Sequence, residues 1–250
     1  MKDRFITTSN ATRFLAALTA LQQRGAEEAC LMVLDGQPGQ GKSEVAQWWA
    51  TQTGSVYLRC KREWTPAWML RELLAELRVQ PQYSFERMYR QALEALGARA
   101  RQAGRDGEPF GVVIDEVDHI SRKGELLETL RDLSDMLEVP FVLVGMGKVR
   151  HHLARYPQIA SRVGQYVEFA PATLDDVRAL VCGLCEVPVA DDLVDYLHRA
   201  AAGQAREVKE GIAAIERHGK RNPGQVTLAA MAGQTLLNDR RTGQPIVVRV

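Results

Sequence analysis

Aromatic residues make up only 6% of this 250-residue chain. This scarcity argues against stacking on single-stranded bases as a main binding mode. The formal net charge is +1, so binding to a nucleic acid would have to come from a local basic patch. No apolar run approaches the roughly 20 residues that a membrane-spanning helix needs. The first residues lead into a polar segment instead of a signal-peptide core. We therefore expect a cytoplasmic protein.

Cysteine is also scarce, with four residues in the chain. Cys182 and Cys185 have the spacing of a metal or redox pair, but no second pair or histidine cluster lies nearby, and a structural zinc needs four ligands. We favour two reduced thiols on a helix. Cys30 and Cys60 flank apolar runs and are expected to be buried.

What the chain does have is an alternation of apolar runs with helical patterns. The runs predict strands at residues 29–34, 55–59, 110–114, 141–144 and 166–169. The helical patterns between and before them cover residues 10–24, 42–52, 65–77, 84–103 and 125–137, with a polar loop at 104–109. Strands that alternate with helices predict an α/β fold, a parallel sheet with right-handed crossovers. From 173 to about 232 the pattern is helical, which predicts a second, smaller domain.

One segment carries a specific chemical pattern. Residues 36–43, GQPGQGKS, match G-x-x-x-x-G-K-[ST] at every required position, between an apolar run and a helical pattern. Glycines allow backbone N–H groups to surround a polyphosphate. The predicted nucleotide contacts are Gly36, Gln37, Pro38, Gly39, Gln40, Gly41, Lys42, Ser43 and Glu44. Lys42 would reach the β- and γ-phosphates and Ser43 would ligate Mg²⁺. A chance glycine turn is the alternative, and the complete spacing favours a nucleoside triphosphate, ATP.

Two carboxylates follow the apolar run at 112–114. Asp115 stands where a Mg²⁺–nucleotide site needs an acid at the end of a strand. Glu116 would polarise the water that attacks the γ-phosphate. A solvated turn is the alternative for such a dipeptide. The pair, about 70 residues after a complete phosphate loop, favours ATP hydrolysis over the phosphoryl transfer of a metabolite kinase.

With both motifs and a helical region in this order, the chain resembles the AAA+ ATPases. The resemblance implies a P-loop NTPase fold: a three-layer parallel-sheet domain at 1–171, a small helical lid domain at 172–237 and a tail at 238–250. Arg162 is similar to the family's arginine finger, which reaches a neighbouring subunit's γ-phosphate. Arg206, in Gly203-Gln204-Ala205-Arg206, looks like the second sensor that contacts nucleotide. For each arginine the alternative is a solvated surface charge.

The chain departs from the family at one point. The run at 141–144 ends in Gly145-Met146-Gly147, where AAA+ enzymes place a polar first sensor such as Asn or Thr. No side chain there can orient the attacking water in the same way. We therefore expect slow basal hydrolysis that DNA or a partner stimulates.

Within AAA+, the compact form and the segment 59–66, RCKREWTP, look most like the transposition ATPases of the phage Mu B family, over about residues 5–235. This resemblance implies an ATP-dependent ring or helical homo-oligomer in the cytoplasm of a bacterial host. Such an oligomer would coat double-stranded DNA non-specifically, capture target DNA and activate a partner transposase of the DDE type in phage or transposon transposition.

DNA contacts without sequence preference come mainly from phosphate neutralisation. Candidate contacts are Arg59, Lys61 and Arg62, and, after the acidic pair, Arg122 and Lys123. Repetition around an oligomer would multiply weak contacts; solvated basic loops are the alternative. The basic residues near the end of the chain either contact DNA or transposase or belong to a flexible end. They are Lys220, Arg221, Arg240, Arg241 and Arg249.

Three other functions stay open. An initiator or helicase-loader ATPase normally adds a helix-turn-helix domain, which is not evident. A secretion-associated ATPase would usually carry a membrane span. An interaction scaffold switched by ATP, without a DNA role, is consistent with the missing first sensor. Among smaller predictions, Trp48 and Trp49 are expected in the core, and His151 and His152 on the surface.

Overall fold

The computed structural model describes residues 1–240 and 242–249. Its internal contacts divide the chain into two compact units, each considered by itself. The sheet unit comprises Arg13–Gln37 and Lys42–Phe169. The helical unit comprises Met1–Thr12, Pro38–Gly41 and the chain from Ala170 onward. The predicted boundaries at 171/172 and 237/238 stay predictions. No helix in the described ranges combines the length and apolarity that crossing a membrane requires.

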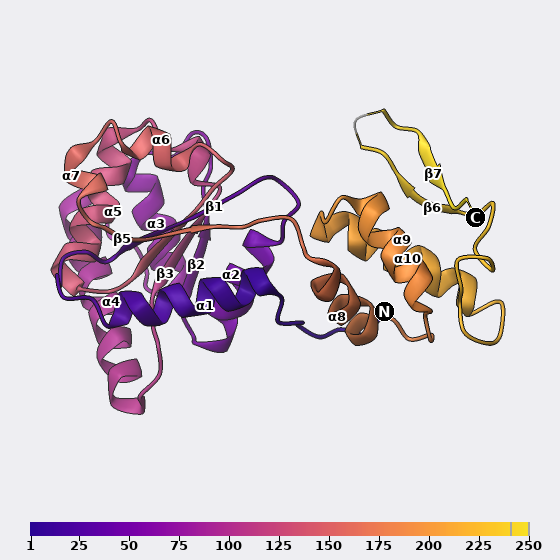
Figure 1. The fold of residues 1–250 in the computed structure, drawn as a ribbon. Coiled ribbons are helices and arrows are strands. Elements are labelled where there is room, and N and C mark those ends of the chain that lie inside the picture. The colour runs from indigo at the N-terminus through magenta and orange to yellow at the C-terminus, as the bar shows by residue number, and fades with distance from the viewer. Residues whose placement is uncertain (241, 250) are drawn as a thin grey trace. The chain divides into compact units, whose positions relative to one another are not determined.

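The sheet unit contains five parallel strands in the order β2-β3-β4-β1-β5 (Figure 1). Their bounds are β1 Leu31–Asp35, β2 Val56–Arg59, β3 Val112–Asp115, β4 Phe141–Val144 and β5 Val163–Glu168. The three central strands are apolar almost throughout because helices cover both faces. The predicted α/β fold with a parallel sheet is confirmed. All five carboxyl ends meet at one edge of the sheet, which is where ligands bind in open sheets of this kind.

Helices pack against both faces of this sheet. The helices of this part of the chain are α1 Ser9–Gln22, α2 Lys42–Gln52, α3 Pro66–Glu76, α4 Phe85–Asp106, the 3₁₀ turn η1 Val117–His119, α5 Gly124–Leu137, α6 Val149–Leu153 and α7 Pro157–Ala160. The Thr65 and Ser84 side chains cap α3 and α4 by accepting backbone N–H groups. Helix α4 runs three residues beyond its predicted end because Gly107, at φ 71°, is the residue that terminates it.

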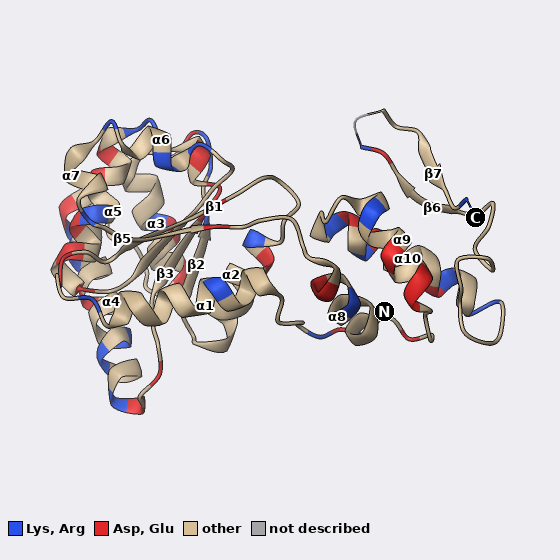
Figure 2. Ribbon diagram, in the orientation of Figure 1, with Lys and Arg blue, Asp and Glu red and all other residues tan. Residues whose placement is uncertain are grey.

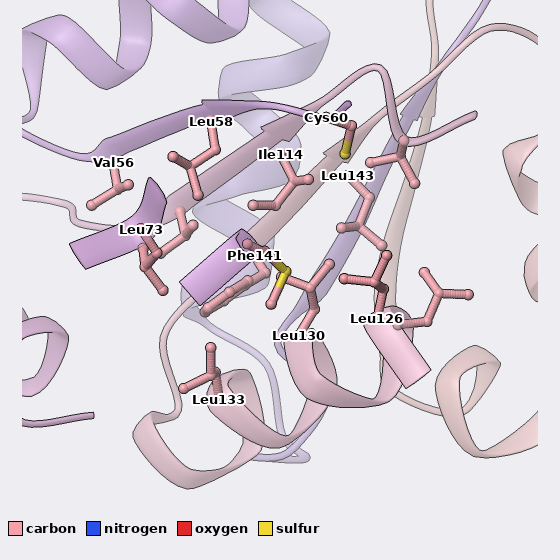
Figure 3. Close-up of a cluster of buried hydrophobic side chains, with 14 of the residues drawn as sticks. Val56, Leu58, Cys60, Leu73, Ile114, Leu126, Leu130, Leu133, Phe141 and Leu143 are labelled. Carbon is pink, nitrogen blue, oxygen red and sulfur yellow. The ribbon is translucent and has the colours of Figure 1, made fainter. Parts of the chain in front are cut away.

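Figure 3 shows the main hydrophobic core on one face of the sheet. Leucines of α5 (Leu126, Leu130 and Leu133) lie against strand residues such as Phe141 and Leu143. Cys60 belongs to this cluster, and Cys30 is also buried, both as predicted. On the other face Trp49 of α2 is 4% exposed and meets Phe14 of α1 edge-on, with ring centroids 6.1 Å apart. Trp49 is therefore a core residue, as the sequence predicts.

The helical unit has its own apolar core. Helices α8 Leu174–Leu184, α9 Asp191–Ala201 and α10 Ala205–Gly219 surround it. After them comes an antiparallel hairpin, β6 Thr235–Asn238 and β7 Pro245–Val247. Leu236, Leu237 and Val248 are buried in the same core as the helices. The final segment therefore contributes to the core of this unit, which differs from the flexible end that was one of two expectations.

Ion pairs occupy part of the basic set near the end of the chain. The Lys220 ammonium lies 2.8 Å from both Glu186 and Glu216, and Arg240 pairs with Glu207. Arg241 lies outside the described residues. Cys182 is exposed and Cys185 is buried at the end of α8, and both are free thiols. Pairing leaves Lys220 and Arg240 less available to neutralise phosphates.

Candidate nucleotide-binding site

The phosphate-loop sequence forms a loop between β1 and α2. Gly36, Gly39 and Gly41 have φ values of 140°, 88° and 86°. Side chains with a Cβ rarely adopt such values, so the glycines are needed for the course of the backbone. The loop follows the carboxyl end of β1 and leads into the first turn of α2, where helix N–H groups have no partners within the helix. This is the geometry that polyphosphates occupy in other proteins.

Lys42 lies in a confined position at the start of α2. Its ammonium donates to the carbonyls of Gly36 and Gln37, at 2.7 and 2.8 Å. Burial lowers the pKa of Lys42, and the carboxylates of Asp35, Asp115 and Asp118 act in the opposite direction. The side chain is thus a positive charge near three acids. Its contact with β- and γ-phosphates stays a prediction.

Asp115 is a buried carboxylate at the end of β3, only 3% exposed. Its Oδ1 accepts the Glu116 N–H at 2.8 Å and its Oδ2 accepts the Tyr57 hydroxyl at 2.5 Å. Burial, followed by the hydrogen bond to Asp115, raises the pKa of Tyr57, so the phenol keeps its proton and holds the carboxylate in place. Sequence reasoning missed Tyr57. The only indication would have been the pairing of β2 with β3, because Arg59, two residues after Tyr57, is paired in register with Asp115.

Glu116 has a left-handed backbone, φ 56°, which non-glycine residues seldom adopt. Its carboxylate is ion-paired with Arg59, and His119 Nε2 lies 3.5 Å away. The hydrogen bond from Arg59 lowers the pKa of Glu116 and outweighs the opposing effect of burial. The Glu116 carboxylate is therefore kept charged and bound to Arg59 of β2. The role of Glu116 as general base stays a prediction.

Two further carboxylates, which sequence reasoning missed, organise the turn after β4. Asp35 Oδ1 accepts the N–H groups of Gly36, at 2.8 Å, and Gly147. Asp118 Oδ2 accepts the Met146 N–H at 2.7 Å. Gly145 has no room for a side chain, since a Cβ there would lie 2.0 Å from Cγ2 of Val149. Where the family has a polar first sensor, this chain has a backbone turn held by two acids.

The two arginines predicted to act on nucleotide lie in different environments. Arg162 precedes β5, and its Nε is 2.9 Å from Asp135 Oδ2 of α5. The structure thus pairs Arg162 within its own subunit. The Arg206 side chain is exposed in the first turn of α10, and the backbone N–H of Arg206 donates to the carbonyl of Gly39 at 3.0 Å. Arg206 is therefore beside a residue of the phosphate loop, while its role and that of Arg162 stay predictions.

The candidate DNA contacts form one neighbourhood, although about 60 residues separate the two clusters. Lys123 Nζ donates to the carbonyls of Arg62 and Trp64, at 2.5 and 3.2 Å. Arg59 pairs with Glu116, and Lys61 pairs with Glu72 while lying 5.5 Å from the Trp68 ring centre. The Arg62 side chain is 85% exposed, more than those of Arg59 and Lys61. Figure 2 shows basic and acidic residues interspersed along the helices of each unit.

One histidine prediction is wrong. His152 is 7% exposed, and its Nδ1 lies 2.7 Å from the Ser121 hydroxyl. Arg122 lies 3.4 Å from the other ring nitrogen, and burial lowers the pKa of His152. The short helix α6 places this residue against the loop after η1, which a single-sequence pattern of five residues does not reveal. His151 is exposed, as predicted.

Comparison with known proteins defines the class. A profile of the AAA domain family matches residues 24–153, more than half of the chain. The chain therefore belongs to the AAA domain family. A potential ATP-binding protein from Staphylococcus aureus is 31% identical over 70 residues, which cover 28% of this chain and 25% of that relative.

Several solved structures share the fold. The Aeropyrum pernix ORC1 protein, solved in complex with DNA, matches with a TM-score of 0.58 and 18% identity, over 89% of this chain and 63% of that one. Cdc6p from Pyrobaculum aerophilum matches with a TM-score of 0.59 and 15% identity, over 88% of this chain and 65% of that one. A RuvB variant from Thermotoga maritima matches with a TM-score of 0.58 and 18% identity, over 91% of this chain and 68% of that one. The chain thus spans a quarter of the curated relative and less than two thirds of ORC1 and Cdc6p.

Proposed function

We propose that this chain binds and hydrolyses ATP. The observation that carries the proposal is the pairing of a phosphate loop, with three positive-φ glycines, and a buried carboxylate at the end of a strand in the same sheet. Membership of the AAA domain family and the similarity to a potential ATP-binding protein support it. In this proposal the loop amides and Lys42 bind the phosphates, with Glu44 in the adjoining turn of α2.

The residues present suit Mg²⁺, which prefers oxygen ligands. The Ser43 side chain is exposed in the first turn of α2 and makes no hydrogen bond among the described residues. The Asp115 carboxylate receives one hydrogen bond on each oxygen and so keeps lone pairs for a metal or its waters. When bound, Mg²⁺ would neutralise charge on the phosphate oxygens.

Glu116 would accept a proton from the attacking water once its carboxylate leaves Arg59. The Arg59 pair and the absence of a polar side chain at Gly145 both support slow basal hydrolysis. In the proposed oligomer Arg162 exchanges Asp135 for the γ-phosphate of a neighbouring subunit. Arg206 would contact the phosphates of its own subunit.

We propose further that the ATPase coats duplex DNA as a ring or helical oligomer, captures target DNA and activates a transposase, as in the phage Mu B family. The neighbourhood of Lys61, Arg62 and Lys123 supports a DNA contact. The resemblance of segment 59–66 supports the transposition role.

A specific observation favours a second candidate, an initiator-type ATPase. The fold matches ORC1, which was solved with DNA, and Cdc6p over nearly nine tenths of this chain. Loading of a replicative helicase onto DNA by the purified chain would favour this candidate. Stimulation of strand transfer by a transposase would favour the first.

The test is electron microscopy of the purified protein on linear duplex DNA, with ATP and without it, alongside Lys42→Ala. We expect regular decoration only with ATP, and none for the variant. Isolated monomers under both conditions would favour the scaffold function. Calorimetry that registers no ATP binding would overturn the whole proposal.

A further inference from the structure

Two adjoining cavities lie along α5 in the sheet unit. The first, about 560 Å³, is lined by Pro66, Phe85, Tyr89, Glu125, Glu128, Thr129 and Asp132. The second, about 350 Å³, is lined by Trp64, Thr65, Pro66, Lys123, Gly124, Glu125 and Leu126. They share Pro66 and Glu125, so we treat them as one feature, the α5 groove. None of its lining residues belongs to the phosphate loop or the acidic pair.

The first cavity is acidic. Glu125, Glu128, Thr129 and Asp132 recur at helical spacing and so occupy one face of α5. The leucines at 126, 130 and 133 point from the same helix into the core (Figure 3). None of the described residues that line this cavity is a lysine or arginine. Glu128 accepts only an amide N–H, from Gln158 at 3.1 Å, and Glu125 has no ion pair among the described residues. Asp132 pairs with Arg131. The wall therefore carries two carboxylates, Glu125 and Glu128, that form no ion pair among the described residues.

The opposite side of the first cavity is aromatic and exposed. Phe85 is 44% exposed and stacks on Tyr89, with ring centroids 6.1 Å apart. Trp68, Tyr83 and Met136 are also exposed, at 36%, 103% and 65%, on or beside the helices that border the groove. Clustered large apolar side chains at a surface mark interaction sites more often than scattered ones do.

The second cavity contains a donor without an acceptor. Trp64 is 1% exposed, and its indole Nε1 has no hydrogen-bond partner. Buried polar groups are normally paired. Beside it lie Lys123 and the first turn of α5, where Gly124 and Glu125 have backbone N–H groups that no described acceptor satisfies. This end of the groove offers hydrogen-bond donors and so suits a main-chain carbonyl.

We propose that the α5 groove binds a short segment of a partner protein that combines apolar anchors with Lys or Arg. Its apolar side chains pack on Phe85 and Tyr89, and its basic side chains meet Glu125 and Glu128. A main-chain carbonyl of the segment accepts from Trp64 Nε1. The groove shares no residue with the predicted ATP site and only Lys123 with the predicted DNA contacts, so the proposal does not depend on ATP binding.

The test is selection of random twelve-residue peptides, displayed on phage, against the purified full chain. Synthetic copies of the enriched peptides are then measured by fluorescence anisotropy. We expect enriched sequences that combine apolar and basic residues. We expect Phe85→Ser and Glu128→Lys to weaken their binding by about tenfold or more, as loss of an interface anchor does. Trp64→Phe removes the N–H, with a smaller phenyl ring in place of the indole, and should weaken binding about fivefold.

Matched controls are Tyr166→Ser, an aromatic residue 41% exposed on β5, and Glu94→Lys, an exposed acid of α4 outside the groove. Both should bind the peptides as the wild type does. Thermal melting checks that each variant folds. Peptides whose affinity is the same for folded groove variants and controls would overturn the proposal. Self-association that Phe85→Ser abolishes would overturn it too, because the occupant would then be a second copy of this chain.

Discussion

At the scale of a single residue, Arg59 connects the two activities that we propose. It is the last residue of β2, paired in register with Asp115 of β3, and its guanidinium holds the Glu116 carboxylate. The same arginine belongs to the basic cluster that we propose for DNA contact. A phosphate that attracts Arg59 would compete with Glu116 for the same donor. In the proposed function, DNA binding and release of the Glu116 carboxylate would thus be linked through one side chain.

Arg59→Ala should raise ATP turnover without DNA several-fold. Removing the guanidinium frees the Glu116 carboxylate and raises its pKa toward the usual value, which makes it a better base. The measurement is steady-state phosphate release with and without duplex DNA. The matched control is Arg62→Ala, because Arg62 is exposed and has no contact with Glu116. Turnover that stays unchanged or falls would contradict the restraining role of Arg59.

Glu216 should make stability depend on acid pH. Burial acts to raise its pKa, but hydrogen bonds from Lys220 and the N-terminal amine outweigh burial and lower the pKa to about 2. A carboxyl with a depressed folded-state pKa stabilises the fold above its unfolded value, near 4.5, and loses that contribution as pH falls toward about 2.

The measurement is urea unfolding of the wild type and Glu216→Gln between pH 6 and pH 2. We expect the difference in stability between them to shrink across the window from about 4.5 to about 2. A difference that is constant over this range would show that Glu216 titrates alike in the folded and unfolded chain.

Local spacing predicted the phosphate-loop residues because the glycines, Lys42 and Ser43 are defined by their order within eight residues. The positions of Asp35, Asp118 and Tyr57 depend on contacts between different strands and loops. Asp118, for example, acts on the backbone of Met146, 28 residues away. No single-sequence pattern encodes such a contact, so these three residues were missed although each lies near a recognised motif.

At the scale of elements, the hairpin β6–β7 is the main addition to the predicted fold. Its Leu237 is 4% exposed, and one of its methyl groups lies 3.5 Å from where a Cβ on Gly211 of α10 would be. The hairpin therefore packs tightly against this helix. Its strands have four and three residues, too short for a clear alternating pattern, and this explains why the sequence indicated only a tail.

Leu237→Ala should destabilise the helical unit by about 2–5 kcal/mol, the usual cost of a cavity at a buried leucine. Guanidinium unfolding monitored by circular dichroism measures the change. Thr235→Ala, at an exposed position of the same strand, should cost far less. Equal effects of the two substitutions would mean that the hairpin adds little to the core.

The strand predictions differ in accuracy, and β5 has the largest error in its start. β3 and β4 are buried at every residue, and their apolar runs placed them within a few residues. β5 begins at Val163, three residues before its predicted start, because its first residues alternate between exposed and half-buried positions. Only its second half carries a strong apolar pattern.

At the scale of the molecule, the parallel sheet brings distant loops together. β2 and β3 are neighbours, so the loops after their carboxyl ends meet, and Lys123 binds the backbone of Arg62 across them. The sequence identified both basic clusters but not their proximity, since strand order is a property of the whole sheet. The two basic clusters are therefore neighbours in the structure.

Replacing Lys61 and Arg62 together with alanine should weaken binding to duplex DNA. It should reduce the slope of log affinity against log salt by about 1–2, since up to two phosphate contacts are lost. ATP affinity should stay the same. Arg101→Ala with Arg105→Ala, two exposed residues of α4, removes equal charge elsewhere as a control. DNA affinity and slope that match this control would exclude the basic loop from the interface.

Gly145 has a consequence for any attempt to introduce the missing first sensor by design. An asparagine grafted at that position would collide with Val149, whose methyl lies 2.0 Å from the new Cβ, and would crowd the Asp118 carboxylate at 3.0 Å. The graft would need a smaller residue at 149 in the same step. Either substitution alone would leave a clash or a cavity. Evolution therefore could not introduce the asparagine amide at position 145 by single substitutions without passing through a destabilised protein.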